Sequence, residues 1–349
     1  MATLRATQLD IARQAGVGRT TVSLALKDNP KISLATRRRV QALAKQLGYI
    51  PDPMLSALAM YRTRQRPKSF QGTLAWLVNG GDGYDWKSGP YYIAYFRGAA
   101  ERAASYGYQI EEFQLQPGQL SGSRLAAMLR ARNTTGILLC PQPRADMEMP
   151  FAWDGFSAVT FGYSLTKPLL HTVASAHFLN TRHVMSELAR RGYRRPGLVI
   201  DRALDLRCGS NIHAGFLIAR VLNPALAPIP PLLDYHHQDT DRHACARDLA
   251  GYIRQHRIDA LVTADYTIID PLKLAGFSVP DNIGVAGLSL TSGNTEISGI
   301  VEDSEKIGAI AVDVLVGMIQ RGEKGVPPLP IRTHLEGTWR DGITLRLPA

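Results

Sequence analysis

The chain has few cysteines and no long apolar run. Cys140, Cys208 and Cys245 are far apart, odd in number and without a Cys-x-x-Cys pair, which argues against a disulfide framework and against a structural zinc site. No segment approaches the roughly 18 consecutive apolar residues of a membrane-spanning helix. The first ten residues, MATLRATQLD, lack the apolar core of a secretory signal. We therefore expect a cytoplasmic protein that holds no metal and needs no cofactor.

Catalytic signatures are also missing. The glycines of NGGDGYD (79–85) open no Gly-x-Gly-x-x-Gly helix and precede no Walker lysine, and neither a Gly-x-Ser-x-Gly nor a His-Glu-x-x-His pattern occurs. The segment DYHHQDTDRH (234–243) could bind a metal, but its position between a predicted strand and a predicted helix favours a polar connector. An enzyme is the main alternative from another class of protein, and we expect no catalytic residue.

The N-terminal fifth of the chain has almost no acidic residues. Residues 1–70 carry thirteen Lys and Arg against three Asp and no Glu. Since the whole chain has 40 basic and 30 acidic residues, the rest carries 27 of each, and the entire excess of +10 lies in this head. A basic head on a neutral body is typical of proteins that bind polyanions such as nucleic acid. The alternative is a solvated basic tail.

Helix signals in the head argue against such a tail. Thr7 and Asp10 form a predicted capping box, and Gly16 follows where the end of a helix favours a positive φ. A second short helix is predicted at about 19–26 and a third at 33–48. The positions expected to face inward are Ile11, Ala12, Ala15, Val22, Leu26, Val40, Leu43, Ala44 and Leu47. This pattern predicts an all-α helix-turn-helix whose second helix enters the major groove.

The head also carries a specific signature. The stretch TQLDIARQAGVGRTTVSLALKDNPKISLATRRRVQALAKQLGYIPD closely resembles the LacI/GalR (lactose-repressor/galactose-repressor) family. It contains DIA-x-x-AGV-x-x-x-TVS, TR-x-RV and LGY-x-P in order and without gaps. The resemblance implies a helix-turn-helix DNA-binding domain at 1–50 in a sequence-specific transcriptional regulator, with repression as the expected sign. Such a protein binds a pseudo-palindromic operator in double-stranded DNA as a homodimer.

The resemblance implies which side chains of the head contact DNA. Arg19 and Thr20 open the recognition helix and face base edges, and Arg suits a bidentate pair with guanine. The further expected contacts, several of them to phosphate, are Gly18, Ser23, Leu24, Lys27, Lys31, Ser33 and Thr36. Gly18 stands where the family commonly has Ser, so a helix cap and a phosphate contact are lost. Leu24 replaces a polar base-reading side chain and is expected to meet a thymine methyl.

Residues 51–71 are expected to form a hinge helix and a linker. Asp52 is a good N-cap, and Pro53 suits the first helical position. In the family this helix pairs with its twin and inserts a leucine into the minor groove at the operator centre, which kinks the duplex. Leu58 falls at that position, although Pro53 and Leu55 depart from the usual pattern. The alternative is that Leu58 is an ordinary core residue.

From residue 72 onwards strand-like and helix-like segments alternate, which predicts doubly wound parallel α/β sheets. The predicted strands are TLAWLVN, QIEEFQL, TGILLC, FSAVTFGY, PGLVI, DALVTA and IGVAGL. The family resemblance, best here in VPDNIGVAGLSL and EKIGAIAVDVLVGMIQRGE, implies a periplasmic-binding-protein-like body at 72–349 with three crossovers between two lobes. We expect these lobes at approximately 72–170 plus 299–330 and at 171–298 plus 331–349.

A small-molecule effector that modulates operator affinity is expected between the lobes, at the carboxyl ends of the strands. A sugar or sugar derivative is one class that the family suggests. The candidate residues, each of which could instead be simple lining, are Tyr91, Tyr92, Arg207, Asn211, Asp265, Ser289 and Glu302. Two departures matter: Ile212 stands where the family often has an arginine that holds a sugar or acid group, a role that Arg207 or Asn211 could take instead. Ser289 replaces the Asp of the family's Gly-x-Asp. A ligand-free architectural DNA binder is a second rival, but it would not need so large a body.

Overall fold

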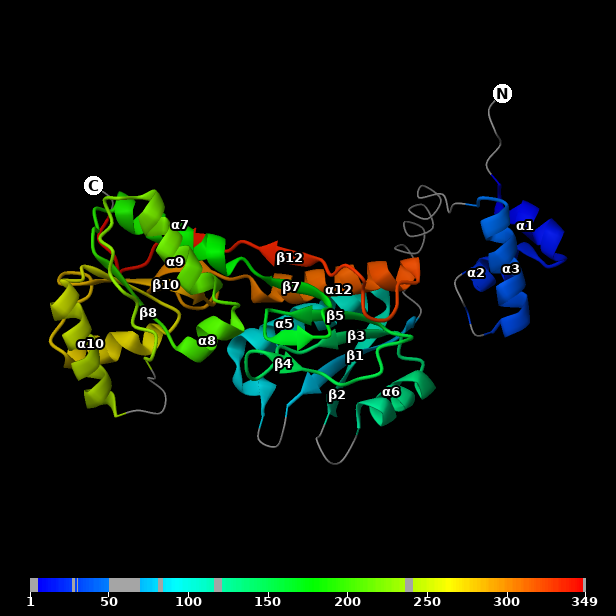
Figure 1. Cartoon of the computed structure of the whole chain (residues 1–349), viewed down its shortest axis with the longest axis horizontal. Helices are drawn as coiled ribbons and strands as arrows, with labels where there is room; N and C mark the ends of the chain where they lie inside the picture. Colours follow the sequence, from blue (N-terminus) through cyan, green and yellow to red (C-terminus); the bar gives the residue numbers. More distant parts are fainter. Residues whose placement is uncertain are drawn as a thin grey trace, which may run out of the picture. The chain divides into compact units, whose positions relative to one another are not determined.

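The structure, a computed structural model, describes residues 6–26, 29, 31–49, 70–80, 84–115, 121–235 and 241–347. The chain divides into two compact units, and the division falls after Phe70. The smaller unit is the head and the larger unit is the body (Figure 1). Most of the expected hinge at 51–71, including Leu58, lies outside the described residues, as do Lys27 and the centre of the His/Asp-rich connector. The predictions made for these positions stay predictions.

The described residues of the head contain three helices: α1 Gln8–Ala15, α2 Arg19–Leu26 and α3 Leu34–Gln46. The capping box predicted at Thr7 is present, because the Asp10 backbone N–H donates to the Thr7 hydroxyl and the Thr7 backbone N–H donates to Asp10 Oδ2 at 2.8 Å. Gly16 ends α1 with a φ of 62°. The Ser33 hydroxyl caps α3 by accepting the backbone N–H of Thr36. Local chemistry therefore fixes the helix boundaries as the sequence indicates.

The core of the head lies between all three helices. Its buried residues are Ile11, Ala12, Ala15, Val22, Ala25, Val40 and Ala44. Ala25 takes a central position that the sequence assigned to Leu26, while Leu26, Leu43 and Leu47 are only partly buried around it. The small side chain at this position brings α2 close to α3, and the Gln41 amide donates to the Ala25 carbonyl at 3.2 Å. The second helix is thereby held firmly against the third.

The first lobe of the body is built on a six-stranded parallel sheet of order β12-β7-β5-β3-β1-β2. Its strands are β1 Gly72–Asn79, β2 Tyr108–Leu115, β3 Gly136–Leu139, β5 Ser157–Phe161, β7 His171–Ser175 and β12 Arg332–Leu335. Its helices are the 3-10 helix η1 Trp86–Ser88, α5 Pro90–Tyr106, α6 Gly122–Ala131 and α12 Ser304–Arg321. Two short strands, β4 Met147–Glu148 and β6 Leu165–Lys167, form a separate pair.

The second lobe has a five-stranded sheet of order β13-β11-β10-β9-β8, in which only β13 is antiparallel to its neighbour. Its strands are β8 Pro196–Val199, β9 Ala260–Thr263, β10 Gly284–Leu290, β11 Ser298–Val301 and β13 Thr338–Arg340. Its helices are α7 His177–Arg190, α8 Arg202–Arg207, α9 Asn211–Leu222, α10 Arg242–His256, the 3-10 helix η2 Tyr266–Ile268 and α11 Ile269–Leu274. The predicted doubly wound parallel sheets are therefore confirmed.

The chain passes between the lobes three times, as expected, but each passage lies a few residues away from the expected lobe boundary. The passages follow β7, β11 and β12. Residues 171–175 and 332–335 belong to the first sheet and not to the second lobe, because β7 pairs with β5 and β12 pairs with β7. The first and third passages are bonded to each other: the Ala176 N–H donates to the Leu335 carbonyl at 2.8 Å, and the Gly337 N–H donates to Asn180 Oδ1 at 3.0 Å.

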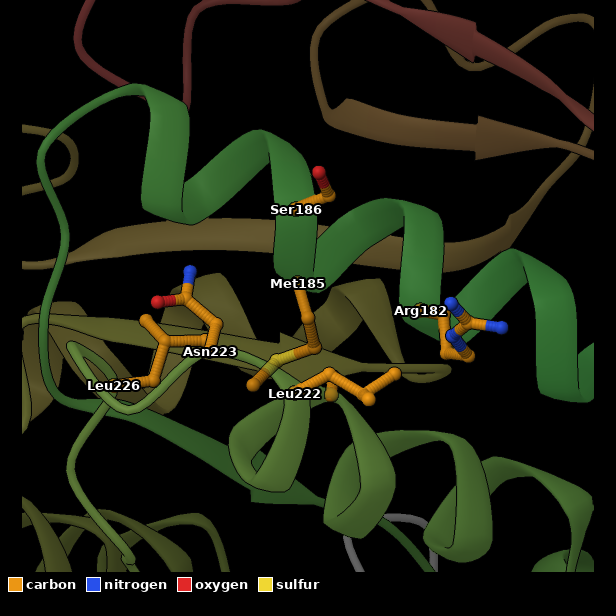
Figure 2. Close-up of a pocket in the computed structure, with 7 residues that line it drawn as sticks. Arg182, Met185, Ser186, Leu222, Asn223 and Leu226 are labelled. Atoms are coloured by element: carbon orange, nitrogen blue, oxygen red, sulfur yellow. The ribbon is translucent and has the colours of Figure 1, made fainter.

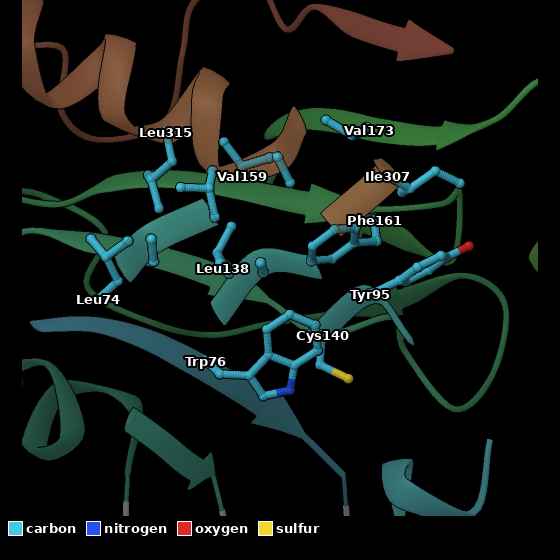
Figure 3. Close-up of a cluster of buried hydrophobic side chains, with 14 of the residues drawn as sticks. Leu74, Trp76, Tyr95, Leu138, Cys140, Val159, Phe161, Val173, Ile307 and Leu315 are labelled. Atoms are coloured by element: carbon cyan, nitrogen blue, oxygen red, sulfur yellow. The ribbon is translucent and has the colours of Figure 1, made fainter. Parts of the chain in front are cut away.

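The core of the first lobe lies between its sheet and the pair α5 and α12. Figure 3 shows Trp76, Leu138, Val159 and Phe161 of the sheet facing Ile307 and Leu315 of α12, with Tyr95 of α5 beside them. The two helices meet at glycines: a Cβ added to Gly98 or Gly308 would lie within 3 Å of backbone atoms of the facing helix. This close approach fixes α5, which carries three tyrosines toward the second lobe.

Candidate functional site

The exposed face of α2 carries the expected base-reading residues. Val22 and Ala25 are buried on the inner face, whereas Gly18, Arg19 and Thr20 are exposed at the start of the helix. The other described candidates are also at least partly accessible: Ser23, Leu24, Lys31, Ser33 and Thr36. An exposed helix N-terminus can be inserted into the major groove without unfolding the head, which is the geometry that a recognition helix needs.

Three of these candidates already have structural partners in the head. The Ser33 hydroxyl is engaged as the cap of α3 and lies 2.9 Å from the Thr36 hydroxyl. Phosphate at this point would therefore meet the backbone N–H groups of the first turn of α3 as well as the two hydroxyls. The Lys31 backbone N–H donates to Asn29 Oδ1 at 3.0 Å, which orders the turn before α3.

The described part of the head is strongly positive. Asp10 is its sole carboxylate, against Arg13, Arg19, Lys31, Arg37, Arg38, Arg39 and Lys45. Hydrogen bonds from Thr7 lower the pKa of Asp10, so this carboxylate serves the α1 cap. All of these cations except Arg37, which is only half-exposed, are exposed to solvent with little opposing charge, as a surface that binds DNA phosphates requires.

The two lobes contact each other through residues at the carboxyl ends of their strands. The Tyr91 hydroxyl at the start of α5 donates to the Ser289 carbonyl of β10 at 2.5 Å. The Tyr95 hydroxyl donates to Glu302 Oε1 at 3.0 Å, just after β11. Arg207 Nη1 of α8 donates to the Pro143 carbonyl, beyond β3, at 3.4 Å. We call the region of these three contacts the interlobe junction.

The junction thus contains four of the seven expected effector residues, and Tyr92 lies next to it. Burial raises the pKa of Tyr92, while the charge of Arg207 acts in the opposite direction, so the two side chains are close. Asn211 and Asp265 have local structural roles instead. Asn211 Nδ2 donates to the Cys208 carbonyl at 2.7 Å, and Asp265 Oδ1 caps η2 by accepting the Thr267 N–H at 3.0 Å.

The segment of the first lobe that borders the junction, Pro141–Pro143, was not predicted from the sequence as part of the site. Gln142 is fully buried after β3, where its Oε1 accepts from the Asn79 amide at 2.6 Å and its backbone N–H donates to the Ser164 hydroxyl at 3.0 Å. The Tyr84 hydroxyl donates to the Pro141 carbonyl at 3.0 Å. These bonds order the segment that carries the Pro143 carbonyl. The sequence signal for this segment was Gln142, a polar residue between two prolines. Its partners, Asn79 and Ser164, are distant in sequence and could not be predicted.

A titratable cluster behind the junction was also missed. His177 begins α7, directly after the first passage between the lobes. Burial by itself lowers the pKa of His177, but the neighbouring Cys208, Glu302 and Asp205 outweigh burial and raise it to about 9. The charge of the buried Glu302 carboxylate contributes to this rise, and Glu302 also accepts from the Ser304 hydroxyl at 2.9 Å.

Two surface pockets lie elsewhere and contain none of the expected effector residues. One, of about 210 Å³, lies between α7 and α9 and is lined by Arg182, Met185, Ser186, Ala219, Leu222, Asn223 and Leu226 (Figure 2). The other, of about 380 Å³, lies over α5 and α12, with charged residues along it. The side chains expected to bind the effector lie at the interlobe junction, so we do not assign the effector to either pocket.

Among the described residues, no three His, Cys, Asp or Glu side chains form a group suited to a metal, and no helix is long and apolar enough to cross a membrane.

Comparisons with known proteins agree with this geometry. Residues 7–52 match the family model for bacterial regulatory proteins of the lacI family. The transcriptional repressor CytR of Escherichia coli K12 is 26% identical over 262 residues, which cover 67% of this chain and 72% of CytR. The solved complex of the regulator CelR with cellobiose has a TM-score of 0.61 and 22% identity, covering 97% of this chain and 100% of CelR. The lac repressor dimer bound to operator and an anti-inducer has a TM-score of 0.55 and 17% identity, covering 98% and 99%.

A basic helix-turn-helix head followed by two lobes of this topology defines a DNA-binding transcriptional regulator. The head signature, the relatives and the fold together place it more narrowly. Its head matches the lacI family of bacterial regulatory proteins over residues 7–52, and most of the chain is similar to a repressor, CytR.

Proposed function

We propose that this regulator is a cytoplasmic repressor that binds a pseudo-palindromic operator as a homodimer and responds to a small molecule bound between its lobes. The observation that carries the proposal is that the chain combines an exposed recognition helix in a cationic head with an interlobe junction made of polar groups from both lobes. The CytR name describes a repressor, and the lac repressor structure is a dimer on operator. Binding, without catalysis, accounts for both regions.

In the head, Arg19 and Thr20 are proposed to read base edges, with Gly18 allowing close approach of the backbone. Ser23, Lys27, Lys31, Ser33 and Thr36 are proposed to contact phosphates, Leu24 a thymine methyl, and Leu58 the central minor groove step. Contacts to phosphate fix the register of the head on the duplex, while base contacts give specificity. The exposure of the first turn of α2 supports this division of roles.

In the body, Tyr91, Tyr92, Arg207, Ser289 and Glu302 are proposed as the effector contacts. Asn211 and Asp265 are kept as lining beside them. Tyr91 and Tyr92 belong to the first lobe and Arg207 belongs to the second. An effector that binds all three therefore changes the preferred angle between the lobes. A change in that angle, transmitted to the dimer and the hinge, would alter operator affinity by a coupling free energy of typically about 1–3 kcal/mol.

Selection of bound duplexes from a random DNA library, with purified full-length protein at stated salt, tests the proposal. We expect a palindromic site with a flexible central step, and we expect it to be lost when residues 1–60 are deleted. Recovery of no preferred sequence, with and without added metabolites, would contradict operator binding. A non-palindromic site bound by a monomer would contradict the homodimer.

A further inference from the structure

The interlobe junction contains an arginine that meets no carboxylate among the described residues. Arg207 is half-buried at the end of α8, and its guanidinium donates a single long hydrogen bond of 3.4 Å to the Pro143 carbonyl of the opposite lobe. A guanidinium has five N–H donors in a planar fork. Most of this donor capacity is therefore available to a ligand that enters between the lobes.

The carboxylates nearest to the junction are occupied by other donors. Glu302 accepts from the Tyr95 and Ser304 hydroxyls at 3.0 and 2.9 Å. Asp205 is buried and accepts the His213 backbone N–H at 3.1 Å. At Ser289, where an Asp was expected from the family pattern, the backbone carbonyl accepts from Tyr91. The junction has thus lost one acceptor for neutral hydroxyls and retains a cation with spare donors.

The surroundings of Arg207 strengthen its attraction for an anion. Tyr84 and Tyr92 are both close enough for its charge to act on their hydroxyls, and burial raises the pKa of both, so they stay neutral donors. The Pro141–Pro143 segment is held by the Gln142 network, so the carbonyl that Arg207 now contacts is a fixed one. In such a partly desolvated place a charge-assisted, bidentate bond is much stronger than a long bond to a neutral carbonyl.

We propose that the effector of this regulator carries an anionic group, a carboxylate or a phosphate, which Arg207 binds from the second lobe in place of its bond to Pro143. The inference rests on the proposed effector-sensing function and narrows its ligand class to acidic or phosphorylated small molecules. It also gives closure a chemical cause, because the anion bound to Arg207 would then lie beside Tyr92 of the first lobe.

The test uses the full-length protein and two variants of the same helix. R207Q removes the proposed anion-binding charge. R202Q is the matched control, because Arg202 is exposed on α8 and pairs with Asp234 at 2.8 Å on the surface. Phosphate, acetate, gluconate, glucose 6-phosphate and glucose are titrated into each protein by calorimetry at constant ionic strength. Since both variants lose one charge, anion binding by the basic head is the same in each comparison.

We expect at least one of the four anions to bind the wild type and R202Q alike and to bind R207Q roughly 10- to 100-fold more weakly. Gluconate against glucose 6-phosphate then identifies the charged group, carboxylate or phosphate. The proposal would be overturned by equal anion affinity in R207Q, by glucose binding as tight as that of both gluconate and glucose 6-phosphate, or by wild-type anion binding no tighter than that of R207Q. If operator selection succeeds in those cases, the regulator function stands and only the anionic ligand class fails. If operator selection fails, the proposed function fails independently of Arg207.

Discussion

The contact between α5 and α12 allows a sharp prediction about Gly308. A Cβ at this position would lie 2.7 Å from the Tyr95 carbonyl carbon and 2.9 Å from the Ala99 backbone nitrogen. Backbone atoms cannot rotate aside as a side chain can, so the helices must separate. Overpacking costs about 1–3 kcal/mol, and its upper end applies here. Replacing Gly by Ala within a helix returns about 1 kcal/mol, so Gly308→Ala should destabilise the body by about 2 kcal/mol.

Gly251 provides the matched control. It lies on the exposed face of α10, and nothing stands within 4 Å of an added Cβ. Gly251→Ala should therefore stabilise the body by about 0.5–1 kcal/mol, the opposite sign for the same chemical change. Urea denaturation followed by tryptophan fluorescence measures both, because all four tryptophans are in the body. A Gly308→Ala protein as stable as Gly251→Ala would refute the backbone contact between α5 and α12.

Three further predictions concern the head and the titratable cluster. Arg19→Ala should cost roughly 1–3 kcal/mol of operator binding and relax specificity at one base position, whereas a uniform loss over all sequences in a binding assay would make Arg19 a phosphate contact. Thr7→Ala should cost about 1 kcal/mol of head stability, which would be measured as faster hydrogen exchange of the α1 amides. Because the pKa of Asp10 is lowered in the folded head, the wild-type cap should weaken as the pH falls through that pKa. His177 has its pKa raised from 6.5 to about 9, so its contribution to body stability should be complete below pH 6.5 and lost as pH rises through about 9. His177→Gln should remove this loss, and an unchanged slope in urea denaturation between pH 6.5 and 9 would contradict the cluster.

Features that depend on neighbouring residues were predictable from the sequence. The capping box at Thr7, the positive φ of Gly16 and the Ser33 cap each involve atoms within a few residues, and all are present. The buried strands of the body could be found because continuous apolar runs are typical of parallel sheets with both faces covered. β12 could not be found, because it is an edge strand whose residues alternate between exposed and half-buried without an apolar face.

The chemistry of the interlobe junction was only partly predictable. Positions at strand ends indicated Arg207 and Glu302, and both take part in interlobe contacts. The partners of these residues come from segments far away in sequence, so neither the Pro143 carbonyl nor the Tyr95 hydroxyl could be assigned to them. The same reason explains why Gln142 and His177 were missed. Their roles arise from buried bonds that form only once the sheets are assembled.

The bonded passages between the lobes limit how an effector can act. The first and third passages are joined by the Ala176 and Gly337 bonds, and a Cβ on Gly337 would lie 2.7 Å from the Val301 carbonyl oxygen, so the second passage packs against the same point. Because the three interlobe passages are packed together near Gly337, they resist sliding of one lobe over the other. Rotation of the lobes about these passages is then the easiest motion. Inducing and antagonising ligands would then differ only in the angle that each one favours. We expect mutations at Gly337 to shift the response to every effector in the same direction, whatever the effector's chemistry.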